Sequence, residues 1–103
     1  MRKPALFVAS IAAALSFISL PAQAQDLSKA RYLAANCANC HGTDGKSVGG
    51  IESLAGYDRD RFIKSMTDFR DGKRPASIMH QLSKGYTDEQ IAQLAAFFSA
   101  QRK

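Results

Sequence analysis

The stretch NCANCHGTDG, residues 36–45, contains both cysteines of the chain and one of its two histidines. Cys37 and Cys40 are three positions apart, and His41 follows directly. This Cys-x-x-Cys-His order is the pattern of covalent haem attachment. At the end of a helix, two thiols with this spacing can reach the two vinyl groups on one edge of a porphyrin, and the next residue can turn its imidazole toward the iron. The motif therefore predicts one covalently bound haem c, with His41 as the proximal axial ligand.

Other uses of a closely spaced cysteine pair agree less well with the surrounding sequence. A thioredoxin-like redox pair needs alternating strands and helices around the motif, whereas the residues before Cys37 have helical periodicity. A structural zinc site needs four ligands, and beyond the motif only His80 is available, without the usual paired spacing. An iron–sulfur cluster usually needs four cysteines, and a disulfide over so short a spacing would be strained. Attached haem is the interpretation that the rest of the sequence favours.

Residues 1–24 have the composition of a secretory signal peptide. Two basic residues follow the first methionine, residues 5–20 are largely apolar, and Ala22 and Ala24 form a small-x-small cleavage site. A membrane-spanning helix needs about 20 apolar residues, and this run is shorter and interrupted by serines. We therefore expect cleavage near Ala24, export to the periplasm, a mature domain over residues 25–103, and no membrane span in that domain.

The charge of the mature domain argues against a nucleic-acid partner. The whole chain has 14 basic and 9 acidic side chains, a formal charge of +5, and two of the basic residues belong to the leader. Removing them leaves a charge of +3, and the remaining lysines and arginines are dispersed instead of clustered as on a nucleic-acid-binding surface. A domain this small is only marginally stabilised by an apolar core. A covalently bound cofactor would complete that core.

Apolar residues at helical spacing predict an all-α domain of three to five helices. The first helix is expected over residues 26–36, leading directly into the cysteines. The second is expected to begin at Asp58 or Asp60 as its N-cap and to end near residues 71–72. The last helix begins at a capping-box sequence, Thr87 to Gln90, and continues with a broad apolar stripe. The mature sequence has no sustained alternation of the kind typical of a strand.

Two irregular segments connect these helices. Residues 42–56 contain five glycines, and a loop of this length in a small domain usually has a functional role, here to enclose a ligand. Residues 76–84 follow Pro75 and are expected to form a short helical or extended piece that ends at Gly85.

Three side chains are candidates for the sixth ligand of the iron. Met66 lies on the apolar stripe of the second helix, where methionine usually fills core space. Met79 lies on the irregular segment after Pro75, far enough from His41 for the chain to close over the opposite face of a haem. His80 is its neighbour and would point elsewhere, toward the surface. We therefore expect Met79 as the distal axial ligand. Methionine together with histidine raises the reduction potential of a haem.

The segments CHGTDG, SLAGYD, MTDFRDGKRPASIM and LSKGYTDEQIAQLAAFFS resemble class I c-type cytochromes, and among them the small haem subunit of flavocytochrome c sulfide dehydrogenases and related periplasmic monohaem cytochromes. The resemblance covers the whole mature domain. It implies the class I cytochrome c fold, thioether links at Cys37 and Cys40, and iron ligation by His41 and Met79. It also implies that Leu54 packs on the haem ring. It further implies that the first and last helices cross, with Ala30 and Ala34 near Phe97 and Phe98.

One part of the loop departs from the family pattern. Many relatives have a proline after the motif that supports the proximal histidine, whereas Gly49-Gly50-Ile51 occupies that stretch here. A haem-ligating imidazole usually donates its other ring proton to a neighbouring acceptor. We therefore expect a backbone carbonyl near Gly50 to accept the Nδ1 proton of His41.

The predicted function is periplasmic electron transfer. An iron with two strong axial ligands has no open position for a substrate, so the chain itself is not expected to be an enzyme. The resemblance implies a redox partner protein, first of all the flavoprotein subunit of a sulfide dehydrogenase. The alternatives are a free-standing shuttle to an oxidase or another dehydrogenase, and a five-coordinate haem sensor without a methionine ligand. Exposed basic residues could steer an acidic partner, namely Lys46, Lys73, Arg74 and Lys84.

Overall fold

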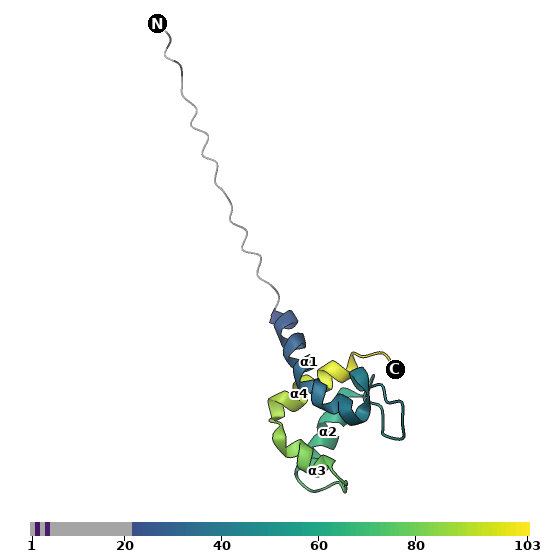
Figure 1. Ribbon diagram of the computed structural model, residues 1–103. Coiled ribbons are helices and arrows are strands. Elements are labelled where there is room, and N and C mark those ends of the chain that lie inside the picture. Colours follow the sequence, from purple (N-terminus) through teal and green to yellow (C-terminus); the bar gives the residue numbers. More distant parts are fainter. Residues whose placement is uncertain (1, 3, 5–21) are drawn as a thin grey trace.

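The computed structural model describes residues 2, 4 and 22–103 (Figure 1). In chain order its elements are α1 (Ala22–His41), η1 (Thr43–Gly45), α2 (Arg59–Arg70), α3 (Met79–Leu82), η2 (Ser83–Gly85) and α4 (Asp88–Ser99). The two η elements are short 3₁₀ helices, and the described residues contain no β-strand. The predicted all-α class is therefore confirmed. Most of the predicted leader, residues 1–24, lies outside the described residues.

Helix α1 continues through the whole attachment motif, which corrects the predicted end near Asn36. No helix-breaking residue occurs before Gly42, which has a φ of 86° in the left-handed region. A Cβ atom at Gly42 would lie 2.0 Å from the carbonyl oxygen of Lys46, so a side chain would displace the backbone there. The helix therefore ends at His41, and both cysteines of the motif are held on a regular helix.

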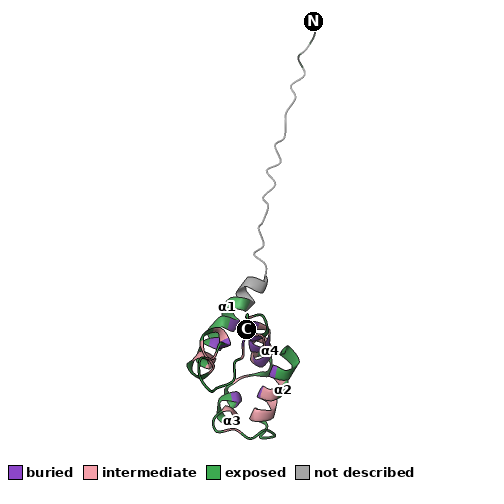
Figure 2. Ribbon diagram, turned by 90° about the vertical axis from the view of Figure 1, so that its right-hand side faces the viewer, coloured by how far each residue is buried: buried purple, intermediate pink, exposed green. Residues whose placement is uncertain are grey.

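Helices α1 and α4 cross through small side chains, as the resemblance implied. Ala30 and Ala34 are 3% and 5% exposed and belong to the same core cluster as Phe97 and Phe98. Alanine lets the two helix backbones approach closely, and buried residues occur on both helices (Figure 2). The guanidinium of Arg31 covers the contact at 5.9 Å from the Phe97 ring centroid. The first and last helices thus form one side of the core.

Helix α2 forms the opposite side of the core. The side chain of Asp58 accepts a hydrogen bond from the backbone N–H of Arg61 at 2.9 Å, so Asp58 is the N-cap that begins the helix. Phe62 and Met66 are buried one turn apart against α4. After Arg70 the chain turns at Gly72, which has a positive φ of 74°. Of the two N-caps predicted, Asp58 is the one observed, and the helix ends close to the predicted residues 71–72.

Helix α4 begins with the predicted capping box. The Thr87 hydroxyl accepts from the Gln90 N–H at 3.1 Å, and the Gln90 side chain accepts from the Thr87 N–H at 3.0 Å. The Arg70 guanidinium, at the end of α2, donates to the Asp88 carboxylate at 2.6 Å. This ion pair holds the end of α2 beside the start of α4.

The glycine-rich loop between α1 and α2 is fixed at several points. The amides of Leu54 and Ala55 both donate to the Gly45 carbonyl, at 2.8 and 3.1 Å. The amide of Gly56 donates to the Phe98 carbonyl at 2.9 Å, which joins the loop to α4. The second irregular segment forms α3 and η2, packed against α2 (Figure 1). The two segments, together with α1 and α2, border one cavity.

Candidate functional site

A cavity of about 300 Å³ lies between the end of α1, one face of α2 and the segment that contains α3. Its volume is at the lower end of the range of about 300–1,000 Å³ found for small-molecule sites. Much of its wall is apolar, formed by Ile51, Leu54, Phe62, Met66, Phe69, Ile78, Met79 and Leu82. An apolar wall drawn from three separate segments suits a flat, largely hydrophobic ligand.

All three residues of the attachment motif line this cavity. Cys37 is half-buried, Cys40 is exposed, and they form no disulfide bond with each other. Residues three and four apart on a helix share one side, so α1 presents Cys37, Cys40 and His41 together. The helix alone therefore aligns two thiols and an imidazole along one edge of the cavity.

The imidazole of His41 is oriented by a backbone carbonyl. Its Nδ1 lies 2.6 Å from the carbonyl oxygen of Glu52, so Nδ1–H is the donor and the lone pair of Nε2 is free. The acceptor is a backbone carbonyl near Gly50, as expected, and the structure identifies it as that of Glu52. Gly49 and Gly50 lie at an exposed tip with open space around them. Glu52 comes after that tip, on the arm of the loop that is fixed to Gly45.

The predicted distal ligand also lines the cavity. Met79 is the first residue of α3, and it packs, partly buried, against the core. Met66 lines the cavity as well, but its Sδ accepts a hydrogen bond from the buried Ser83 hydroxyl at 3.6 Å. His80 is not among the lining residues, and it is partly buried instead of lying at the surface as expected. Of the three candidates, Met79 is the one with an available ligand atom at the cavity.

Arg74 is exposed, as expected, and it also lines the cavity, which the sequence did not predict. The Arg74 guanidinium donates to the Ser65 hydroxyl at 2.9 Å and lies 4.7 Å from the Phe69 ring centroid. All three residues line the cavity. An isolated arginine between Gly72 and Pro75 has no periodicity from which its direction could be predicted. The structure thus places a positively charged side chain, held by two contacts, at the wall of a largely apolar cavity.

The side of the cavity near Cys37 is electrically neutral. Burial raises the pKa of the Cys37 thiol, although hydrogen bonds from its own backbone and with Tyr86 act in the opposite direction. Burial also raises the pKa of the Tyr86 hydroxyl, and negative charge on Cys37 would add to that effect. Both groups are therefore uncharged at neutral pH.

These residues fit haem c and do not fit the other interpretations of the motif. In the part of the chain that the structure describes, no group of three or more His, Cys, Asp and Glu side chains is placed to hold a metal ion. His80 therefore does not complete a zinc site with the cysteines. Two thiols, an imidazole with a free nitrogen and a thioether border one apolar cavity in an all-α domain. This fold and this site define a c-type haem protein.

Residues 25–101 match the family model described as cytochrome c, and the chain belongs to the cytochrome c family. It is 38% identical over 71 residues to the cytochrome subunit of sulfide dehydrogenase of Chlorobaculum tepidum, covering 69% of this chain and 64% of that protein. It is 32% identical over 102 residues to cytochrome c-553 of Nitratidesulfovibrio vulgaris, covering 94% of this chain and 97% of that protein. The structure of Acidithiobacillus ferrooxidans cytochrome c4 matches with a TM-score of 0.64 and 29% identity, covering 82% of this chain and 52% of that one.

These similarities confirm the predicted class I cytochrome c fold and the predicted family. The chain is an electron-transfer protein of the cytochrome c type, and its family implies covalently bound haem c. It spans less than two thirds of the sulfide dehydrogenase subunit and about half of the cytochrome c4 chain. Among the described residues, no helix has both the length and the apolar character that crossing a membrane requires.

Proposed function

We propose that this chain is an exported carrier of single electrons that binds one haem c through Cys37, Cys40, His41 and Met79. The observation that carries the proposal is the position of His41 and Met79. Each borders the same apolar cavity with an unshared ligand atom, and they come from two separate elements, α1 and α3. Two axial ligands of this kind leave no open coordination position, which suits a carrier better than a catalyst.

Each residue of the site has a distinct task. Cys37 and Cys40 add their S–H groups across two vinyl groups, which leaves two thioether bonds to the ring. His41 is held by the Glu52 carbonyl with Nε2 available to the iron. Bound haem supplies reversible one-electron chemistry at its iron. Leu54, with the aromatic residues of α2, keeps water from the ring.

The same cavity has one group suited to the carboxylates of haem. Among its described lining residues, Arg74 alone has a permanent positive charge. Its bond to Ser65 and its contact with Phe69 hold the guanidinium in place before any ligand binds. A fixed guanidinium can accept a carboxylate without loss of side-chain freedom. Arg74 is therefore assigned to the haem propionates.

The proposed partner is a flavoprotein that transfers electrons one at a time to this chain in the periplasm. Two observations support it: the leader-like sequence of residues 1–24, and the identity shared with a sulfide dehydrogenase cytochrome subunit. Purification from periplasm under mild conditions tests the proposal. A stoichiometric flavoprotein should elute with the cytochrome, and a lone monomer would contradict a permanent subunit.

A free-standing shuttle is the second candidate. It is supported by the match to cytochrome c-553, which extends over nearly the full length of both chains. A shuttle would elute alone from the same column and would be re-oxidised by a periplasmic extract. The two candidates share the haem site and differ only in the lifetime of the partner complex.

The intact mass of the periplasmic protein tests the proposal as a whole. We expect a chain that begins near Gln25 with the mass of one haem retained under denaturing conditions. A retained leader would contradict export, and the absence of a haem mass would contradict the site.

A further inference from the structure

Two methionines line the haem cavity, whereas an iron that is bound by His41 has one position left to fill. Met66 is on α2 and is 6% exposed, and Met79 is partly buried at the start of α3. Apart from Met1 in the predicted leader, they are the methionines of the chain. Both have the same soft thioether sulfur on a flexible side chain. A preference for Met79 therefore needs a physical cause.

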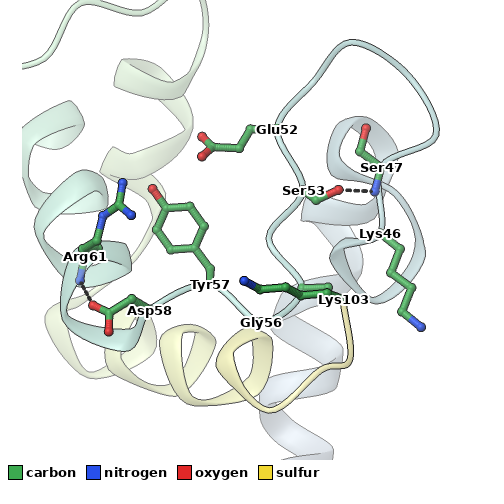
Figure 3. A pocket seen from close by; sticks show the side chains of 10 residues that line it. Lys46, Ser47, Glu52, Ser53, Gly56, Tyr57, Asp58, Arg61 and Lys103 are labelled. Carbon is green, nitrogen blue, oxygen red and sulfur yellow. Dashed lines mark hydrogen bonds between the residues drawn. The ribbon is translucent and has the colours of Figure 1, made fainter.

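A second hollow, of about 530 Å³, lies between the glycine-rich loop, the turn into α2 and Lys103 (Figure 3). Opposite charges are mixed within it. The Glu52 carboxylate lies beside the Tyr57 hydroxyl, and the ring of Tyr57 stands between the side chains of Arg61 and Lys103. None of the described residues that line this hollow has a sulfur atom or an imidazole. The choice between methionine ligands is therefore made within the haem cavity.

Ser83 contacts both methionines. Its backbone N–H donates a hydrogen bond to the carbonyl of Met79, within the continuous segment formed by α3 and η2. Its side-chain hydroxyl donates to Sδ of Met66 at 3.6 Å, which joins η2 to α2 across 17 positions of sequence. The residue that extends the helical turn of Met79 is thus the one that engages the sulfur of Met66.

The burial of Ser83 gives this contact its strength. Among the described residues, Ser83 is the only polar one that is buried, and it is 0% exposed. It is not among the residues that line the cavity. If the Met66 sulfur moved from Ser83 to an iron, the hydroxyl would be left unpaired and out of reach of water. An unpaired buried hydroxyl makes such a move less favourable by about 5- to 150-fold.

We propose that Ser83 selects the distal ligand, because its hydroxyl holds the Met66 sulfur and leaves the position to Met79. Ser83 is a positioning residue, since it acts through the two methionines and is not part of the cavity wall. The inference rests on the proposed function, because it concerns the sixth ligand of the same haem.

Ser83→Ala in a Met79→Ala background tests the proposal on the holoprotein. In Met79→Ala alone Ser83 still holds Met66, so the weak long-wavelength band of methionine-ligated ferric haem should be absent. In the double variant no hydroxyl is left to be unpaired. Ligation by Met66 should become more favourable by about 5- to 150-fold, and the band should return. Loss of a merely structural serine would weaken the fold and would not restore this band.

Three results would overturn the proposal. A band in Met79→Ala alone would show that Met66 binds the iron in spite of Ser83. The absence of the band in Met79→Ala/Ser83→Ala would show that Ser83 does not restrain Met66. A six-coordinate spectrum without the band in the double variant would give the position to a different group, such as His80.

Two further variants control the double substitution. Met66→Leu, added to Met79→Ala and Ser83→Ala, should abolish the restored band, because the mature domain then has no methionine. Ser77→Ala, combined with Met79→Ala, should not restore the band. Ser77 is an exposed serine that lines the cavity on the segment before α3. Equal bands after Ser77→Ala and Ser83→Ala would overturn the role of the hydroxyl of Ser83.

Imidazole titration measures the same change as an affinity. Added imidazole binds the open iron of Met79→Ala, whereas in Met79→Ala/Ser83→Ala it must compete with Met66. The apparent affinity for imidazole should therefore be lower in the double variant, by up to the factor of about 150 given above. An unchanged affinity would mean that Met66 is not released.

Urea unfolding tests the hydrogen bond in protein that retains Met79. Met66→Leu leaves the Ser83 hydroxyl unpaired, whereas Met66→Leu/Ser83→Ala removes both partners. The double variant should therefore be more stable than Met66→Leu alone. Losses that simply add would show that the contact contributes nothing, and the proposal would fail. This measurement decides the matter even if the variants without Met79 do not retain haem.

Failure of this inference can be told apart from failure of the proposed function. A wild-type protein with no haem mass, or without the long-wavelength band, would reject the proposed haem ligation. A wild-type protein that has both, together with a Met79→Ala/Ser83→Ala variant that lacks the band, would reject only the selection by Ser83.

Discussion

The Nδ1 atom of His41 and the carbonyl oxygen of Glu52 lie 2.6 Å apart and join the end of α1 to the far arm of the glycine-rich loop. The acceptor is a backbone atom, so the Glu52 side chain has no part in orienting the imidazole. A backbone acceptor on an arm fixed to Gly45 keeps the ring from rotating before a metal is bound.

Replacement of Glu52 by alanine should therefore leave the proximal ligation unchanged. We expect the visible spectra of the oxidised and reduced forms to match those of the wild-type protein. The control is Gly45→Val, which forces a side chain into a position where a Cβ would lie 2.9 Å from the Ala55 amide nitrogen. A loss of six-coordinate spectra in Glu52→Ala would contradict a purely backbone role.

Replacement of Met79 by alanine should remove the distal ligand. The weak long-wavelength band that methionine sulfur gives in oxidised class I cytochromes should disappear, and the reduction potential should fall because methionine ligation raises it. Met66→Leu is the matched control. It should lower the free energy of unfolding by about 1–3 kcal/mol, because the buried Ser83 hydroxyl loses its acceptor, and it should retain the band. Loss of the band in Met66→Leu instead would show that Met66, and not Met79, is the ligand.

The two cysteines should each contribute one covalent link. Cys37→Ala and Cys40→Ala should each keep haem attached through the remaining thiol, whereas the double variant should release it in acid and acetone. Intact mass under denaturing conditions shows whether each variant retains its haem. Haem that remains covalently attached in the double variant would rule out the thioether assignment.

Gly42 should tolerate substitution much less well than Gly72. Both have positive φ values, 86° and 74°, and this conformation costs an alanine about 1–2 kcal/mol. A Cβ at Gly42 would also meet the Lys46 carbonyl at 2.0 Å, whereas nothing lies within 4 Å of a Cβ at Gly72. We expect Gly42→Ala to lower the free energy of unfolding by more than about 3 kcal/mol, measured by urea denaturation of the holoprotein. Equal losses for the two variants would mean that the backbone contact at Gly42 costs nothing.

Replacement of Arg74 by glutamine should leave the propionates without their counter-charge. We expect a lower reduction potential, because removing a positive charge near the iron favours the oxidised form. Lys84→Gln removes an equal charge outside the cavity and serves as the control. Ser65→Ala should give a smaller change in the same direction, since Ser65 only positions the guanidinium. Identical potentials for Arg74→Gln and Lys84→Gln would show that Arg74 does not interact with the propionates.

Much of the fold could be predicted because its signals are local. The Thr87 to Gln90 capping box begins α4 as expected, and Asp58 caps α2. The spacing of Cys37, Cys40 and His41 is itself a local signal, since one helix is enough to align these residues. Local hydrogen bonds and helical periodicity are encoded within a few residues, so a single sequence reveals them.

The parts that escaped prediction depend on how distant segments meet. The acceptor for His41 depends on which arm of the loop is fixed to Gly45, and the loop sequence alone does not state this. The direction of Arg74 depends on Ser65, nine residues earlier on another element. The end of α1 was placed too early because the apolar periodicity stops near Asn36, whereas only Gly42 forces the chain out of the helix.

The continuity of α1 has a mechanical consequence. This single helix contains the alanines that cross α4 and, within about one turn of its end, the residues assigned to the cofactor. A displacement of the cofactor would therefore be transmitted as a rotation or translation of that helix to its crossing with the last helix. The packing of α1 on α4 and the binding of the cofactor are consequently coupled. A shift in either contact shifts the other.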